Sequence, residues 1–193
     1  TFDTQSLHVS GKSFESIEWR GYAGHYNFSH LPSKIAAESR LAGNSVEGDN
    51  AADSRFSSGF DGYFGGVEAC ACFADWTIVP VVEFQRLHNA RALSGFGNAQ
   101  MMGIGPRINI GDKVLDLRYR SFFIEKDATV ASYNTGSLGT NLMGDDVEFR
   151  LSFPAQKFAI FGEWTGAVPI RNNKDQQTIS KFYLGVETQY APF

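Results

Sequence analysis

Apolar and polar residues alternate along most of this chain with the period of two that is typical of β-strands. Eight segments show this alternation, and they are rich in aromatic and β-branched residues. They span residues 14–28, 56–73, 76–88, 99–110, 114–125, 146–153, 157–170 and 178–191. The stretch SKIAAESRLA at 33–42 could form a short helix, but it lies within a longer loop. The pattern therefore predicts an all-β protein.

The connections between the predicted strands alternate between short and long. The sequences AD, GDK and PAQ form tight turns, whereas residues 29–55, 89–98, 126–145 and 171–177 form long loops rich in Gly, Asn, Ser and Asp. This order places all tight turns at one end of an up-and-down antiparallel sheet and all long loops at the other. We predict an eight-stranded antiparallel β-barrel formed by residues 14–193, with residues 1–13 as an N-terminal extension.

Charged residues are concentrated on one face of the predicted strands. In VLDLRYRSFFIEK (114–126), Asp116, Arg118 and Arg120 alternate with leucine and aromatic side chains, and other strands divide in the same way. A closed interior favours a near balance of charge, because an unpaired buried charge is costly. The residues assigned to this charged face are seven acids and six bases: Glu18, Glu68, Glu83, Asp116, Glu148, Glu163, Glu187, Arg20, Arg107, Arg118, Arg120, Arg150 and Lys181.

An inverted barrel, with a charged lumen and an apolar outer surface, explains both the charge balance and the positions of the aromatics. Arginine suits such a lumen because its planar guanidinium can bind carboxylates from two neighbouring strands. Aromatic residues near strand ends match the interfacial girdles of membrane barrels. Those residues are Trp19, Phe73, Trp76, Phe153, Phe158, Trp164 and Tyr190. Alternation alone also permits a soluble barrel, with Phe182, Leu184 and Val186 lining an apolar pocket.

Composition narrows the alternatives further. The chain has 193 residues, a net charge of −4 and no run of Lys and Arg that would follow a nucleic-acid backbone. No window approaches the roughly 20 apolar residues of a membrane-spanning helix. We therefore expect neither nucleic-acid binding nor a helical membrane protein.

The strand–turn–loop rhythm, the segment LDLRYRSFF and the ending KFYLGVETQYAPF together resemble the small eight-stranded outer-membrane β-barrels. This family includes the OmpA transmembrane domain and the opacity-type adhesins. The resemblance covers residues 14–193 and implies a location in the outer membrane of Gram-negative bacteria, with short periplasmic turns and long extracellular loops. It places the N-terminal extension, residues 1–13, in the periplasm. It also implies that Phe193 is the C-terminal aromatic presented to the barrel-assembly machinery.

The function that the resemblance favours is a structural or adhesion-type scaffold. Its partners would be outer-membrane lipid and lipopolysaccharide, with a surface ligand for loops 29–55 and 126–145. An eight-stranded lumen filled by long Arg and Glu side chains argues against a wide diffusion pore. A narrow pore, a lipid-modifying enzyme and a soluble calycin-like barrel remain as alternatives.

The histidines and cysteines offer weaker candidates for chemistry. His25, His30 and His88 lie toward the long-loop rim, where they could meet a serine or aspartate such as Ser29, Asp53 or Asp61. Rim histidines are more often ordinary loop residues, so we predict no catalytic site.

Cys70 and Cys72 share the face of Glu68. We interpret them as free thiols rather than as a local disulfide or a metal or redox site, because no second ligand pair is visible. The segment GIGPRI (103–108) has glycines spaced as in a nucleotide fingerprint, but no helix follows it. We expect Gly103 and Gly105 to make room for interior side chains instead. The sequence therefore predicts no cofactor and no metal.

Overall fold

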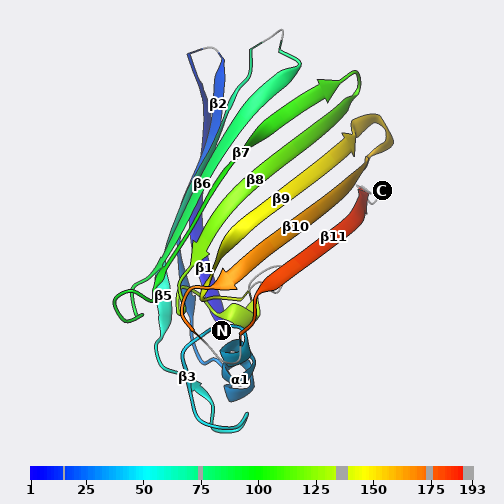
Figure 1. Ribbon diagram of the computed structural model, residues 1–193. Helices are drawn as coiled ribbons and strands as arrows, with labels where there is room; N and C mark the ends of the chain where they lie inside the picture. Colours follow the sequence, from blue (N-terminus) through cyan, green and yellow to red (C-terminus); the bar gives the residue numbers. More distant parts are fainter. Residues whose placement is uncertain (15, 74–75, 134–138, 173–175, 189–193) are drawn as a thin grey trace, which may run out of the picture.

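The computed structural model describes residues 1–14, 16–73, 76–133, 139–172 and 176–188. Nine strands form one antiparallel sheet in the order β1-β2-β5-β6-β7-β8-β9-β10-β11. Their bounds are β1 Phe2–Ser13, β2 Ile17–Phe28, β5 Phe60–Ala71, β6 Ile78–Asn89, β7 Asn98–Ile110, β8 Lys113–Ile124, β9 Leu142–Phe153, β10 Phe158–Pro169 and β11 Ile179–Thr188. Figure 1 shows these strands side by side in a strongly curved sheet.

The remaining elements lie between β2 and β5 and in the later connections. Between β2 and β5 are the helix α1 (Ser33–Leu41) and a two-stranded sheet of β3 (Val46–Glu47) and β4 (Arg55–Phe56). The short helices η1 (Ala131–Tyr133) and η3 (Pro154–Gln156) follow β8 and β9. The predicted all-β class is confirmed, and the short helix expected within 33–42 is present.

The sheet has one strand more than the sequence predicted. β1 pairs with β2 along its whole length, from Phe2 opposite Phe28 to Ser13 opposite Ile17. Residues 2–13 therefore belong to the sheet and are not an extension outside it. The strand was missed because only Leu7 and Val9 are large apolar residues on one of its faces, and its other positions are mostly small or polar.

The long and short connections lie at opposite ends of the sheet, as Figure 1 shows with α1 and β3 far from the tight turns. One turn is formed at Gly111, whose positive φ of 61° favours glycine, and another by η3. The predicted turn at 74–75 lies outside the described residues. The loop predicted to end at 145 ends earlier, because β9 already begins at Leu142.

β1 and β11 are the two edges of the sheet. Eight antiparallel steps separate them, so the two edge strands run in the same direction. Within the described part of the chain, no strand pairs with the outer edge of either one. Closure of the sheet into a barrel, and the count of eight strands, are therefore not seen in this structure.

Candidate functional site

All thirteen residues predicted for the charged face share one face of the sheet. In the strand register, predicted charged residues stand directly opposite one another on neighbouring strands. Examples are Arg20 with Glu68, Glu68 with Glu83, and Asp116 with Arg150. In the same way the register aligns Arg107 with Asp116 and Glu163 with Glu148. Lys181 lies opposite Thr165, and Glu187 lies opposite Ala159, on that face of β10 and β11. We call this face the interior face.

The curvature of the sheet buries the middle of the interior face. Arg118 and Asp146 are each only 7% exposed. A cavity of about 540 Å³ is lined by residues of seven strands, from β2 through β10, with Tyr22 at one end of the series and Glu163 at the other. The interior face is therefore the concave side of the sheet.

Arg120 on β8 is the centre of the interior charge cluster. Its Nε donates to Glu83 Oε1 at 2.6 Å, and its Nη1 donates to Asp146 Oδ1 at 3.0 Å and to Glu148 Oε2. Glu83 lies on β6, two strands away, so the pair passes over Gly103 on β7. A Cβ at Gly103 would lie 2.5 Å from Glu83 Oε1, so the space that glycine leaves is taken up by this ion pair.

Arg118 does not bind the carboxylate that it directly faces across the strands. The register places Arg118 directly opposite Glu148, but its Nη2 donates to Asp116 Oδ1 at 3.1 Å and its Nη1 donates to the carbonyl of Leu117 at 3.0 Å. Arg107 donates to the same Asp116 oxygen at 2.9 Å. Two arginines thus share one aspartate, while Glu148 reaches diagonally to Arg120.

Away from its centre, the interior face carries ion pairs that are more exposed to solvent. Arg20 and Glu68 are joined at 2.9 Å, and Arg150 and Glu187 at 2.8 Å. Two charged residues of the interior face were missed from the sequence. Asp146 was the first residue of a predicted strand, and period-two counting back from Glu148 would have found it. Lys12, 3.8 Å from Glu18, lies on the strand that was not predicted.

The opposite face of the sheet is apolar over its middle and polar only toward its ends. Register places Val82, Leu117, Val147 and Trp164 on this outer face. In the described strands, the charged or histidine residues of this face lie near the long-loop end, apart from Lys113 at a tight turn. Those near the long-loop end are Asp3, His25, Asp61, Arg86, His88 and Asp145.

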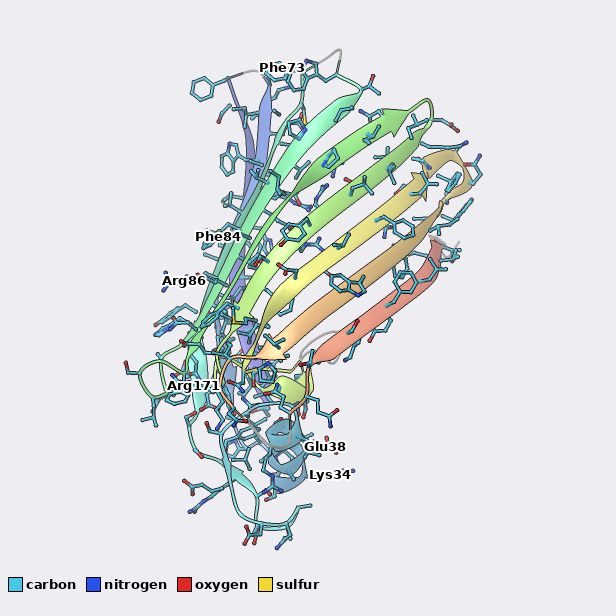
Figure 2. All side chains as sticks on the ribbon, viewed as in Figure 1. Lys34, Glu38, Phe73, Phe84, Arg86 and Arg171 are labelled. Carbon is cyan, nitrogen blue, oxygen red and sulfur yellow. The ribbon has the colours of Figure 1, made fainter. Side chains whose placement is uncertain are left out.

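Large side chains on the outer face are exposed rather than buried. On β11, Phe182 is 65% exposed and Leu184 67% exposed. Figure 2 shows Phe84 on β6 in the middle of the sheet, Phe73 near the tight turns and Arg86 closer to α1. The distribution is therefore opposite to that of a soluble protein, with buried charge inside and exposed apolar surface outside.

The long connections fold together at one mouth of the curved sheet. We define the cap as residues 29–59 and 126–133. Tyr26, Phe60 and Val130 form a buried cluster that joins the cap to the strands, and Tyr26 donates its hydroxyl to the carbonyl of Ala128 at 2.7 Å. In Figure 2, Lys34 and Glu38 mark α1 at the far side of the cap.

Buried asparagines fix the cap in place. Asn44 donates to the carbonyls of Lys126 and Thr129, both at 2.8 Å, and accepts from the backbone N–H of Ala131 at 2.7 Å. Asn89, at the end of β6, likewise donates to the carbonyls of Gly59 and Asp127. Loops 29–55 and 126–145, to which the sequence assigned a surface ligand, are therefore joined by direct hydrogen bonds in their described residues.

The rim histidines make pairs of their own. His25 Nε2 lies 2.6 Å from Asp61 Oδ1, and His88 Nδ1 lies 3.0 Å from the side-chain oxygen of Asn98. The candidate nucleophile Ser29 bonds to the hydroxyl of Thr1. Asp53 accepts hydrogen bonds from Asn50 within its own turn. Among the described residues, the hydrogen bonds of these candidates do not join a serine, a histidine and an acid as a triad.

Cys70 and Cys72 are both free and half-buried. Cys72 lies beyond the end of β5, and burial, assisted by the neighbouring Cys70 thiol and the Glu18 carboxylate, raises the pKa of its thiol to about 11. The thiol is therefore protonated near neutral pH. Phe193, the predicted assembly signal, lies outside the described residues.

Comparison with models of known protein families, with curated proteins and with solved structures found no match. Among the described residues, no helix is long and apolar enough to cross a membrane.

Proposed function

We propose that this chain is a bacterial outer-membrane β-barrel with a lumen filled by ion pairs, which acts as a structural or adhesion-type scaffold for the cap. The observation that carries the proposal is the inverted distribution of side chains. A continuous exposed apolar surface is unfavourable in water but is what lipid chains require, and membrane barrels have polar interiors. The exposure of Phe182 and Leu184 also argues against a soluble barrel whose pocket they would line.

Two adjacent residues of β9 provide a direct test of facing. Leu151 lies on the outer face and Ser152 on the interior face. Each is replaced singly by cysteine in a Cys70→Ser, Cys72→Ser background, labelled with a fluorophore and reconstituted in vesicles with brominated acyl chains. We expect strong quenching of the label at 151 and weak quenching at 152. Equal quenching, or none at 151, would contradict the proposed lipid-facing surface.

Barrel closure is the second part of the proposal. Backbone N–H and C=O groups cannot stay unpaired in the hydrocarbon layer, so the outer edges of β1 and β11 need partners there. The two edges run in the same direction, so their mutual pairing would be parallel. Closure within one chain is supported by the cavity whose lining extends from β2 to β10, because residues of seven neighbouring strands already surround one hollow.

We expect a disulfide to form across the β1–β11 seam within one chain. Cysteine is introduced on β1 at Leu7 or Val9 and on β11 at Phe182, Leu184 or Val186, again without the native cysteines. The cross-linked pair should keep the monomer mass on a non-reducing gel, and the pair that reacts reports the register. Pairing of Leu7→Cys with Leu117→Cys, which lie far apart along the sheet, is the control. If only cross-linked dimers form, the edges of β1 and β11 pair with a second copy of the chain and not with each other.

The cap and the Arg120 cluster define what the scaffold can do. The cluster occupies the middle of the interior, and the cap folds over the mouth beyond it, so free diffusion through the barrel is not favoured. A bacterial outer-membrane location would place the cap outside the cell, with lipopolysaccharide or another envelope or host surface as its partner. The resemblance to the OmpA and opacity-type barrels is consistent with this role, and the barrel-assembly machinery would be the partner during insertion.

A further inference from the structure

A cluster of three metal-binding side chains lies at the tight-turn end of the interior face, apart from the Arg120 cluster. Glu18 on β2 stands directly opposite Cys70 on β5 in the strand register, so both side chains leave the sheet on the same face. Cys72 follows two residues later. Its backbone N–H donates to the carbonyl of Ser16 at 2.6 Å, which holds it beside the start of β2.

These constraints bring the three ligand atoms together. The carboxylate oxygen of Glu18 and the sulfur atoms of Cys70 and Cys72 all lie within 4.8 Å of one another. Zn–S bonds of about 2.3 Å and Zn–O bonds of about 2.0–2.2 Å bring ligand atoms of one tetrahedral site to comparable separations. Small rotations of these side chains are therefore enough for all three to reach one ion.

The surroundings leave room for an ion and for its fourth ligand. Glu18 and Cys70 line a cavity of about 430 Å³ that also contains Lys12, Glu68 and Arg107. Lys12 is 3.8 Å from Glu18, and the side chains of both are more than half exposed, so this contact does not hold the carboxylate firmly. Glu68 is engaged by Arg20 instead.

We propose that Glu18, Cys70 and Cys72 form a binding site for a thiophilic cation such as Zn²⁺, Cd²⁺ or Cu⁺, with water as the fourth ligand. Two sulfur donors select these ions over Mg²⁺ and Ca²⁺, which take oxygen ligands. Binding replaces the protons of the two thiols, which pass to solvent. The bound ion would link the start of β2 to the end of β5 at the tight-turn end of the sheet.

The test is a titration of the whole purified chain with Cd²⁺ under a phosphine reductant, after a thiol count has shown both cysteines reduced. We expect one ion per chain and the ultraviolet charge-transfer absorption of two cadmium–thiolate bonds. Zn²⁺ should displace the cadmium, and excess Mg²⁺ should not. Circular dichroism before each titration verifies that the strands are formed.

Three variants assign the ligands. Cys70→Ser and Cys72→Ser should each remove half of the charge-transfer absorption and weaken binding by at least about a hundredfold. Glu18→Gln changes an exposed side chain, so it should fold normally, keep the full absorption and bind about tenfold more weakly. The matched control Glu68→Gln, on the same face and lining the same cavity, should bind as the natural chain does. Unchanged affinity in Glu18→Gln, equal weakening in Glu68→Gln, or one ion shared by two chains would overturn the proposed site.

Discussion

Replacement of Arg120 by alanine is expected to lower the free energy of unfolding by about 3–5 kcal/mol, because it leaves the buried Asp146 and the partly buried Glu83 and Glu148 without their cation. Arg120 binds Glu83, Asp146 and Glu148, and its side chain is 21% exposed. Denaturant unfolding of the detergent-solubilised chain, followed by circular dichroism, measures the loss.

The matched control is Arg20→Ala, which removes another arginine from the interior face. Arg20 pairs with Glu68 at 2.9 Å, but its side chain is 72% exposed, so water screens the pair. We expect this variant to lose less than about 1 kcal/mol. Similar losses in the two variants would show that Arg120 is as solvated as Arg20 and that the centre of the interior is open to water.

The alternation of side chains was sufficient to predict the interior face, because a strand offers only two faces and the period is two. All thirteen predicted charged positions share that face. Which arginine meets which carboxylate could not be predicted in the same way. Arg118 stands opposite Glu148, yet Asp116 on its own strand is its partner, since long side chains reach diagonal as well as direct neighbours.

β1 and the cap are the parts of the fold that the pattern of apolar and polar residues was too weak to predict. A strand whose faces are both mostly polar has no visible alternation, so β1 resembled a tail although it pairs along its full length with β2. The cap depends on contacts between segments more than 80 residues apart, such as Asn44 with Lys126 and Thr129. Asparagine-rich segments are typical of loops, and nothing local distinguishes a buried asparagine that bonds to a distant backbone from a solvated one.

Replacement of Asn44 by alanine is expected to release the cap while the sheet remains folded. The change leaves the partly buried carbonyl of Thr129 and the buried N–H of Ala131 without their partner, and the carbonyl of Lys126 keeps only the Thr140 hydroxyl. These losses together cost about 3 kcal/mol. Because α1 is also tied to η1 by the contact between the Ser39 and Ser132 hydroxyls, the loss should propagate to the helix.

Trypsin measures this release, since Lys34 and Arg40 lie in α1 and are cut only when the helix opens. If the free energy of opening the cap falls by about 3 kcal/mol, the open form becomes about a hundredfold more populated. Cleavage at these residues should then accelerate by the same factor. The control is Asn50→Ala in the same loop, because Asn50 is exposed and, within the described part of the chain, its side chain bonds to neighbouring residues such as Ala52 and Asp53. Its cleavage should stay close to that of the natural chain, and the strand signal in circular dichroism should be preserved in both variants.

If Asn44→Ala is cut no faster than Asn50→Ala, the apolar cluster of Tyr26, Phe60 and Val130 holds the cap by itself. If instead the strand signal is lost together with the cap, the cap and the sheet unfold as one cooperative unit.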